Sequence, residues 1–224
     1  MTQVARGKRV ETAQKDRGPP FPAFRLNPAV DPESLKTEFA QRRRVQVADF
    51  LATECAAALQ ANLAARHDWR PLAGSESRHG SESIPVPDDP AERRRSDDPL
   101  AAFASFMSDG EALQFLRCVT GCEEIGFADA QATAYSPGGF FSAHDGTAAG
   151  EERLAGYALD LICEWRSNWG GLMLFQGADG LSIDGVVPRF NTLNLFAVPQ
   201  VHSVSIVSRA AAFRRCSVTG WLRK

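Results

Sequence analysis

The sequence predicts a mainly β protein of the α+β class, in which helices precede a jelly roll and pack on one of its faces. In residues 121–224, apolar and polar side chains alternate in short runs separated by Gly, Pro, Asp and Asn. About eight such strands in roughly 100 residues are typical of a closed or double-sheet β unit. Because the helices come first, they should cover one face rather than cross between parallel strands. The strands are expected near 125–135, 139–146, 153–164, 170–176, 182–190, 191–196, 201–207 and 215–222.

Two helices are expected in the supporting region, residues 45–120. Asp49 can cap the first, which carries apolar residues at helical spacing as far as Leu63. Ser108 and Glu111 have the spacing of a capping box for the second helix. Gly121 is suited to end that helix, because glycine adopts the left-handed conformation of many C-caps.

The remaining segments are predicted from composition. Residues 1–20 are polar, end in Gly-Pro-Pro and are expected to form a flexible arm before a single domain, 21–224. Residues 73–99 are rich in Ser, Gly, Pro and charge, which predicts a long loop or a lid. The run Arg93-Arg94-Arg95 inside this loop is interpreted as a solvated face.

The composition excludes several classes of function. With 25 basic and 27 acidic residues the net charge is −2, so no global field favours nucleic acid or an anionic membrane. No apolar stretch is long enough for a membrane span, and the N-terminus lacks the apolar core of a secretory signal. Five scattered cysteines without a CxxC pair suggest neither disulfides nor a thiolate zinc site. A cytoplasmic protein is expected, and nothing in the sequence indicates its oligomeric state.

Two of the four histidines are candidates for chemistry. His67 and His79 fall at a helix end and in the polar loop, where structural or solvent-facing roles are expected. His144 and His202 fall in or beside predicted strands of the β unit. Strands distant in sequence can be neighbours in a jelly roll, so these two imidazoles can meet inside the barrel.

Five sequence blocks surround these histidines in a recognisable order. They are YSPGGFFSAH at 135–144, WGGLMLF at 169–175, FNTLNLF at 190–196, HSV at 202–204 and RCSVTGW at 215–221. Together they resemble the Fe(II)- and 2-oxoglutarate-dependent dioxygenases, specifically the prolyl-4-hydroxylase-like branch. The resemblance is strong over about residues 120–224, fainter over 45–120 and absent from the N-terminal arm.

The resemblance implies a double-stranded β-helix that holds Fe(II) through His144 and His202. In this family the third ligand is a carboxylate two residues after the first histidine, but that position is Gly146 here. Asp145 would point to the opposite face of a strand from His144. A local bulge could instead turn Asp145 inward, and this alternative stays open.

The resemblance also implies a site for 2-oxoglutarate. Arg215 would bind its distal carboxylate, a task that suits the forked donors of a guanidinium. The adjacent Arg214 should point the other way on a strand. Tyr135 matches the position whose hydroxyl assists the cosubstrate, although a half-buried core aromatic is the plainer reading, and Ser217 shares a strand face with Arg215.

The H-x-G sequence at 144–146 is similar to that of the 2-oxoglutarate-dependent halogenases, in which a halide replaces the carboxylate. This implies chlorination or bromination of an unactivated aliphatic C–H bond by a chloro-ferryl radical mechanism that uses O2 and releases succinate and CO2. The expected substrate is a free small molecule, such as an amino acid. One alternative is a hydroxylase, with water or Asp145 at the third position, acting on a small molecule or a peptidyl residue. The other is a non-catalytic remnant of the fold.

Overall fold

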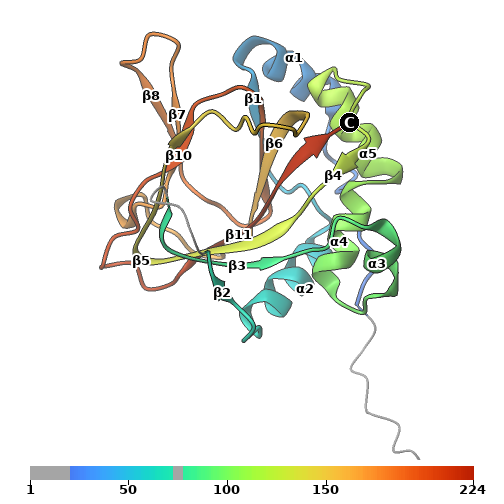
Figure 1. The fold of residues 1–224 in the computed structure, drawn as a ribbon, viewed down its shortest axis with the longest axis horizontal. Coiled ribbons are helices and arrows are strands. Elements are labelled where there is room, and N and C mark those ends of the chain that lie inside the picture. Colours follow the sequence, from blue (N-terminus) through green and yellow to red (C-terminus); the bar gives the residue numbers. More distant parts are fainter. Residues whose placement is uncertain (1–20, 73–77) are drawn as a thin grey trace, which may run out of the picture.

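The computed structural model describes residues 21–72 and 78–224, so the expected arm lies outside the described residues. A curled, antiparallel sheet dominates this part of the chain (Figure 1). The predicted mainly β, jelly-roll class is therefore confirmed. The strands are β1 Arg44–Val47, β2 Arg70–Pro71, β3 Arg78–Pro85, β4 Phe127–Ala128, β5 Gln131–His144, β6 Arg153–Asp160, β7 Met173–Gln176, β8 Ile183–Val186, β9 Thr192–Ala197, β10 His202–Val204 and β11 Arg215–Arg223.

Two strands, β11 and β10, pair with different parts of the same edge of β5. The strand order is β1-β9-β6-β11-β5-β10-β7-β8, with β2 and β3 added on the other edge of β5 and β4 beside β11. β11 pairs with the first part of β5, from Gln131 to Tyr135. β10 pairs with its last part, from Phe141 to His144. Two strands that share one edge must diverge, and the divergence leaves room for a cavity between them.

The two strands expected at 125–135 and 139–146 are instead the short β4, Phe127–Ala128, and one long strand, β5, Gln131–His144. The glycines of Gly138-Gly139 do not end it: they lie in a bulge of β5, where residues 136–139 are opposite the single residue Gly80 of β3. A Cβ on Gly139 would lie 2.7 Å from the carbonyl oxygen of Gly80, so the close approach of the backbones requires glycine there.

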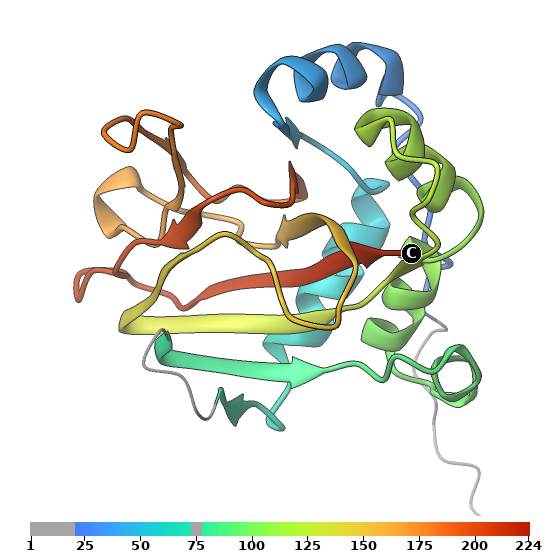
Figure 2. The same cartoon turned by 45° about the horizontal axis from the view of Figure 1, so that its top comes forward.

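The helices gather on one side of the sheet, as the sequence predicts (Figures 1 and 2). Their buried residues, such as Leu59, Phe103 and Leu116, share one core with Leu193 and Val218 of the sheet. Each such side chain contributes about 1.5–3 kcal/mol when fully buried. No helix among the described residues has the length and apolar character to cross a membrane. The helices are α1 Pro32–Arg42, α2 Thr53–Ala64, α3 Pro90–Arg95, α4 Pro99–Met107 and α5 Gly110–Thr120.

The predicted start of the first helix is wrong. α2 begins at Thr53, and Asp49 does not cap it. The residues between them are held in an extended connection to the sheet: the Phe50 N–H donates to the Asn191 carbonyl, and the Leu51 N–H donates to the Asn191 side chain. These bonds satisfy the backbone outside a helix, so the helix starts later.

The predicted capping box is also wrong. Asp109 caps α5 by accepting a hydrogen bond from the Gly110 N–H at 2.7 Å. Ser108 is instead the C-cap of α4, a helix that the sequence interpretation missed. The predicted end is confirmed, because Gly121 is in the left-handed conformation with φ of 67°.

Most of the expected loop at 73–99 is ordered as β3 and α3, while 73–77 lie outside the described residues. β3 was missed because its sequence is polar, yet it pairs with β5 along its whole length. Arg93 is the second correction here. Arg94 and Arg95 are exposed as expected, but Arg93 is only 2% exposed and donates to the carbonyls of Pro87, Ala104 and Ala128.

Candidate functional site

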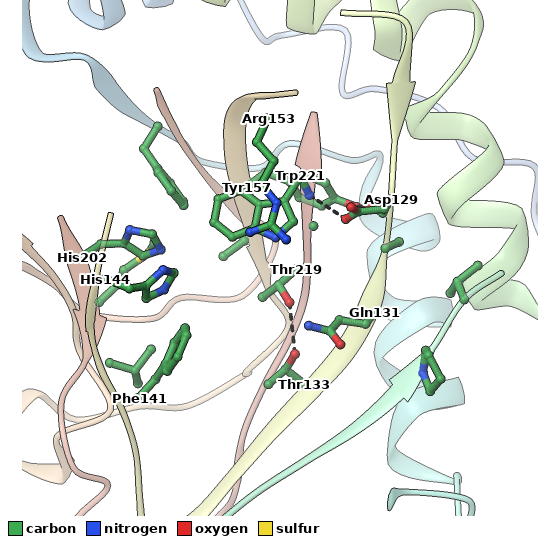
Figure 3. Close-up of a pocket in the computed structure, with 18 of the residues that line it drawn as sticks. Asp129, Gln131, Thr133, Phe141, His144, Arg153, Tyr157, His202, Thr219 and Trp221 are labelled. Atoms are coloured by element: carbon green, nitrogen blue, oxygen red, sulfur yellow. Dashed lines mark hydrogen bonds between the residues drawn. The ribbon is translucent and has the colours of Figure 1, made fainter. Parts of the chain in front are cut away.

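A cavity of about 320 Å3 lies where β10 and β11 diverge from β5 (Figure 3). Its walls come from β5, β6, β7, β9, β10 and β11. Four of the residues singled out from the sequence line it: Tyr135, His144, His202 and Arg215. The fold thus brings together residues that are up to 80 positions apart in the chain.

His144 and His202 are direct partners across β5 and β10. Their ring centroids are 4.1 Å apart, and the two rings lie side by side above Phe141 (Figure 3). His202 Nδ1 lies 2.7 Å from the carbonyl oxygen of Gln200. A carbonyl can only accept, so Nδ1 carries the proton, which leaves Nε2 as the nitrogen available to a metal.

His144 has a different hydrogen bond. Its Nδ1 accepts from the Gly146 N–H at 3.2 Å. The neutral ring therefore carries its proton on Nε2 in this arrangement. To bind a metal through Nε2 as a neutral ligand, the ring would have to carry its proton on Nδ1 instead, and the hydrogen bond from Gly146 would then be lost. His67 and His79, by contrast, are exposed and do not line the cavity. His79 is not in a loop as expected, because it belongs to β3 and lies opposite Phe140 of β5.

Asp145 does not join the histidine pair. Its carboxylate accepts hydrogen bonds from the Thr147 N–H at 3.0 Å and from the Thr147 hydroxyl at 2.7 Å. These two bonds lower the pKa of Asp145, the hydroxyl bond more than the backbone bond. The Asp145 carboxylate is therefore bound to Thr147 rather than turned toward the histidine pair.

Gly146 is buried against Trp221. A Cβ built on Gly146 would lie 2.9 Å from Cζ3 of the indole and 3.3 Å from Val198 Cγ2. The residue also has φ of +84°, which side chains other than glycine rarely adopt. Trp221 in turn lies near both histidines, with ring centroids 6.2 Å from His144 and 6.1 Å from His202. This indole contact is a feature that the sequence interpretation did not anticipate.

Arg215 already has an anionic partner. Its Nη2 lies 3.1 Å from Oδ1 of Asp160, and both side chains are only 2% exposed. The other carboxylate oxygen, Oδ2, accepts a 2.9 Å hydrogen bond from Asn194. Burial raises the pKa of Asp160 to about 6, although Arg215 and Asn194 act in the opposite direction. The sequence contains a signal for Asp160. It is a charged residue on the same strand face as the small residues Gly156 and Ala158.

Two buried polar atoms beside this ion pair have no hydrogen-bond partner among the described residues: Arg215 Nε and Ser217 Oγ. Ser217 is directly opposite Asp160 in the β6–β11 pairing, and it is fully buried. Tyr135 is the cross-strand partner of Arg215, whose guanidinium carbon lies 5.7 Å from the ring centroid. Arg214 points to the other side, as expected, and pairs with Glu82 at 2.6 Å.

The far end of the cavity is polar and was missed in the sequence. The Arg153 guanidinium lies 4.4 Å from the Trp221 ring centroid and donates to the Gly146 carbonyl at 3.1 Å. Asp129 accepts a hydrogen bond from the backbone N–H of Trp221 at 2.7 Å and pairs with Arg223 at 2.9 Å. Burial raises the pKa of Asp129. Figure 3 shows Asp129 on the other side of the cavity from the histidines, with Arg153 above Trp221.

The residues fit a metal held through two neutral imidazoles, which are good ligands for iron. Across residues 21–72 and 78–224, no group of three or more His, Cys, Asp and Glu side chains is arranged to hold a metal. Among these residues, therefore, no carboxylate joins the two histidines. The unpartnered donors of Arg215 and Ser217 fit a carboxylate of a cosubstrate, because buried donors without partners are costly.

Residues 130–223 match the family described as the 2OG-Fe(II) oxygenase superfamily. The histidine pair and Arg215 fall within this matched region, and prolyl-4-hydroxylases are among the structural neighbours. Among curated proteins, none matches the chain by sequence.

Several solved structures share the fold. A Pseudomonas putida prolyl-4-hydroxylase superposes with a TM-score of 0.69 at 22% identity, covering 86% of this chain and 98% of that one. A Trichoplax adhaerens prolyl hydroxylase, in complex with a hypoxia-inducible factor peptide, gives 0.67 at 16%, covering 86% and 88%. A viral collagen prolyl hydroxylase from Paramecium bursaria Chlorella virus-1, in complex with 2OG, gives 0.56 at 17%, covering 82% and 97%.

Proposed function

We propose that this protein is an Fe(II)- and 2-oxoglutarate-dependent halogenase that chlorinates an aliphatic C–H bond of a small molecule. The observation that carries the proposal is the lack of a carboxylate beside the histidine pair among the described residues. Gly146 has no side chain at the position two residues after His144, and Asp145 is bound to Thr147. A metal held by two neutral ligands needs an anion for charge balance, and chloride or bromide can supply it.

In this proposal each part of the cavity has its own task. His144 and His202 hold the iron, and Arg215 with Ser217 binds the distal carboxylate of 2-oxoglutarate. With O2 and 2-oxoglutarate, the bound iron supplies the oxidising power to remove a hydrogen atom from an unactivated C–H bond. Trp221 and Phe196 exclude water around the histidines, since Phe196 lies 4.4 Å from His202 by ring centroids. Tyr135 packs on the Arg215 guanidinium and orients it.

The overall reaction balances with one proton. A substrate R–H, chloride, 2-oxoglutarate, O2 and H⁺ give R–Cl, succinate, CO2 and water. The C–H bond is replaced by a C–Cl bond, and the two electrons removed from the substrate and chloride, with the two from 2-oxoglutarate, reduce O2. The outcome depends on whether the substrate carbon is held closer to the halide than to the oxygen, which makes positioning decisive.

The polar end of the cavity supports an amino-acid-like substrate. Arg153 and Asp129 both line it, so groups of opposite charge face the same space. A zwitterion carrying a carboxylate and an ammonium group would complement them.

A hydroxylase is the second candidate, because the structural neighbours named above are prolyl hydroxylases. In that case water would stand beside the metal in place of the halide, and the substrate could be a peptide. The two candidates differ in chloride dependence. A hydroxylase should turn over equally well with and without halide.

The test is anaerobic loading with Fe(II) and 2-oxoglutarate, followed by chloride titration and a metabolite screen. The halogenase predicts that chloride shifts the charge-transfer absorption of the Fe(II)–2-oxoglutarate complex, and that products gain the mass of chlorine for hydrogen. Hydroxylated products that are the same with and without chloride would contradict it. Asp145→Asn is the matched variant: it keeps an oxygen for Thr147, so unchanged iron affinity is expected unless Asp145 is itself a ligand.

A further inference from the structure

We propose that Asp160 binds a proton when 2-oxoglutarate binds, so that the affinity for this cosubstrate falls as the pH rises. The inference rests on the proposed function for the identity of the cosubstrate. It concerns what Asp160 does to the arginine that would receive the distal carboxylate.

The first step is the occupancy of Arg215. The Asp160 carboxylate lies 3.1 Å from Nη2, and its other oxygen is fixed by Asn194 at 2.9 Å. This ion pair is almost fully buried, so solvent screens it little. Arg215 is therefore electrically neutralised before any ligand arrives.

The second step is the charge count. If the distal carboxylate of 2-oxoglutarate joins Arg215, two carboxylates share one guanidinium in a buried site. Two negatively charged carboxylates this close together repel each other, so the pKa of one of them rises and it takes up a proton. Asp160 is the candidate because burial has already raised its pKa to about 6. A second anion raises this pKa further.

The third step is the surroundings of Asp160. The neighbouring strands β9 and β11 present Thr192, Asn194, Arg215 and Ser217 to it. Arg215 is the only charged side chain of the described residues that acts on the Asp160 pKa. Among the described residues, therefore, no second positive charge acts on Asp160 to balance a second carboxylate. Arg215 Nε and Ser217 Oγ, however, can still donate hydrogen bonds to it. The site can bind the ligand's carboxylate as long as Asp160 becomes neutral.

The experiment is isothermal titration of the anaerobic Fe(II)-loaded protein with 2-oxoglutarate in buffers of different ionisation enthalpy, which counts the protons taken up. At about pH 8 close to one proton per ligand is expected, and the dissociation constant should rise about tenfold per pH unit above pH 6. Asp160→Asn should bind without proton uptake and with little pH dependence. Glu152→Gln, which changes an exposed carboxylate, should behave as the wild type.

A second ligand, 2-oxopentanoate, tests whether the proton uptake depends on the distal carboxylate. 2-Oxopentanoate has the same chain length without that group, so it should bind to the wild type with no proton uptake. Binding of 2-oxoglutarate without proton uptake, or with the same uptake in Asp160→Asn, would overturn the inference while leaving the cosubstrate in place. If 2-oxoglutarate bound neither to the wild type nor to Asp160→Asn at any pH, both the proposed function and the inference would be contradicted.

Discussion

Gly146 and Trp221 are in such close contact that a Cβ on the glycine would lie 2.9 Å from the indole. The glycine therefore has two consequences at once: it provides no metal ligand, and it admits the indole beside the histidines. Because of this contact, Gly146→Asp is a poor way to restore a carboxylate, since the new side chain would have to displace Trp221.

We expect Gly146→Ala to destabilise the fold by about 2–4 kcal/mol, from the positive φ together with the clash with Trp221. Gly150→Ala is the matched control, because Gly150 also has positive φ, +80°, but nothing lies within 4 Å of its Cβ. It should cost only about 1–2 kcal/mol. Urea unfolding of the two variants gives the difference, and equal losses would show that the Trp221 contact has no energetic effect.

Arg93 should contribute strongly to stability. Its guanidinium donates to the backbone carbonyls of Pro87, Ala104 and Ala128, and Arg93→Ala removes all three bonds together with a buried side chain. The Ser108 hydroxyl still donates to the Ala104 and Ala128 carbonyls. The expected loss is at least about 3 kcal/mol in the free energy of unfolding. Arg94→Ala, at an exposed neighbouring position, should change it by about 0.5 kcal/mol or less. Similar losses in both variants, measured by thermal or urea unfolding, would refute the buried role of Arg93.

The stability of the metal-free protein should depend on pH through Asp160. Its pKa is raised from 3.8 to about 6, so the folded state binds the proton more tightly than the unfolded state. This stabilising contribution is complete below the unfolded pKa and is lost as the pH rises from about 4 to 6, by up to about 3 kcal/mol. Urea unfolding between these values should show a slope that is weaker in Asp160→Asn and retained in Glu152→Gln. An unchanged slope in Asp160→Asn would assign the effect to other groups.

Metal binding should raise the melting temperature of the metal-free protein under anaerobic conditions. Fe(II) at about 100 times its dissociation constant adds about 2.7 kcal/mol if it binds only the folded state. His202→Ala should abolish this gain, because one of two protein ligands is lost. His67→Ala, at an exposed site outside the cavity, should keep it. Stabilisation that persists in His202→Ala would place the metal elsewhere.

Much of the fold and part of the site could be predicted from the sequence. The alternation of β6 and β11 and the end of α5 at Gly121 are local signals, and they led to correct elements. The pairing of His144 with His202 followed from the fold class, since both lie on strands of the same β unit. Arg214 and Arg215 were assigned to opposite sides because neighbours on a strand alternate.

The errors have physical causes that a local pattern does not contain. Arg93 looks like part of a solvated run, and its burial depends on carbonyls from three separate segments. The polar β3 is stabilised by pairing with β5 rather than by its own apolar face. The Asp160–Arg215 pair joins residues 55 positions apart, so only the register of β6 against β11 reveals it.

The short pairing between β10 and β5 also limits how the reaction chamber can change in evolution. The strand β10 spans only His202–Val204, and its register against β5 already shifts between these two residues. Insertions or deletions in the segment leading to β11 can therefore resize the chamber without moving the histidines. Changes in the length of the segment between β10 and β11 could therefore alter the substrate that fits, while His144 and His202 keep their positions.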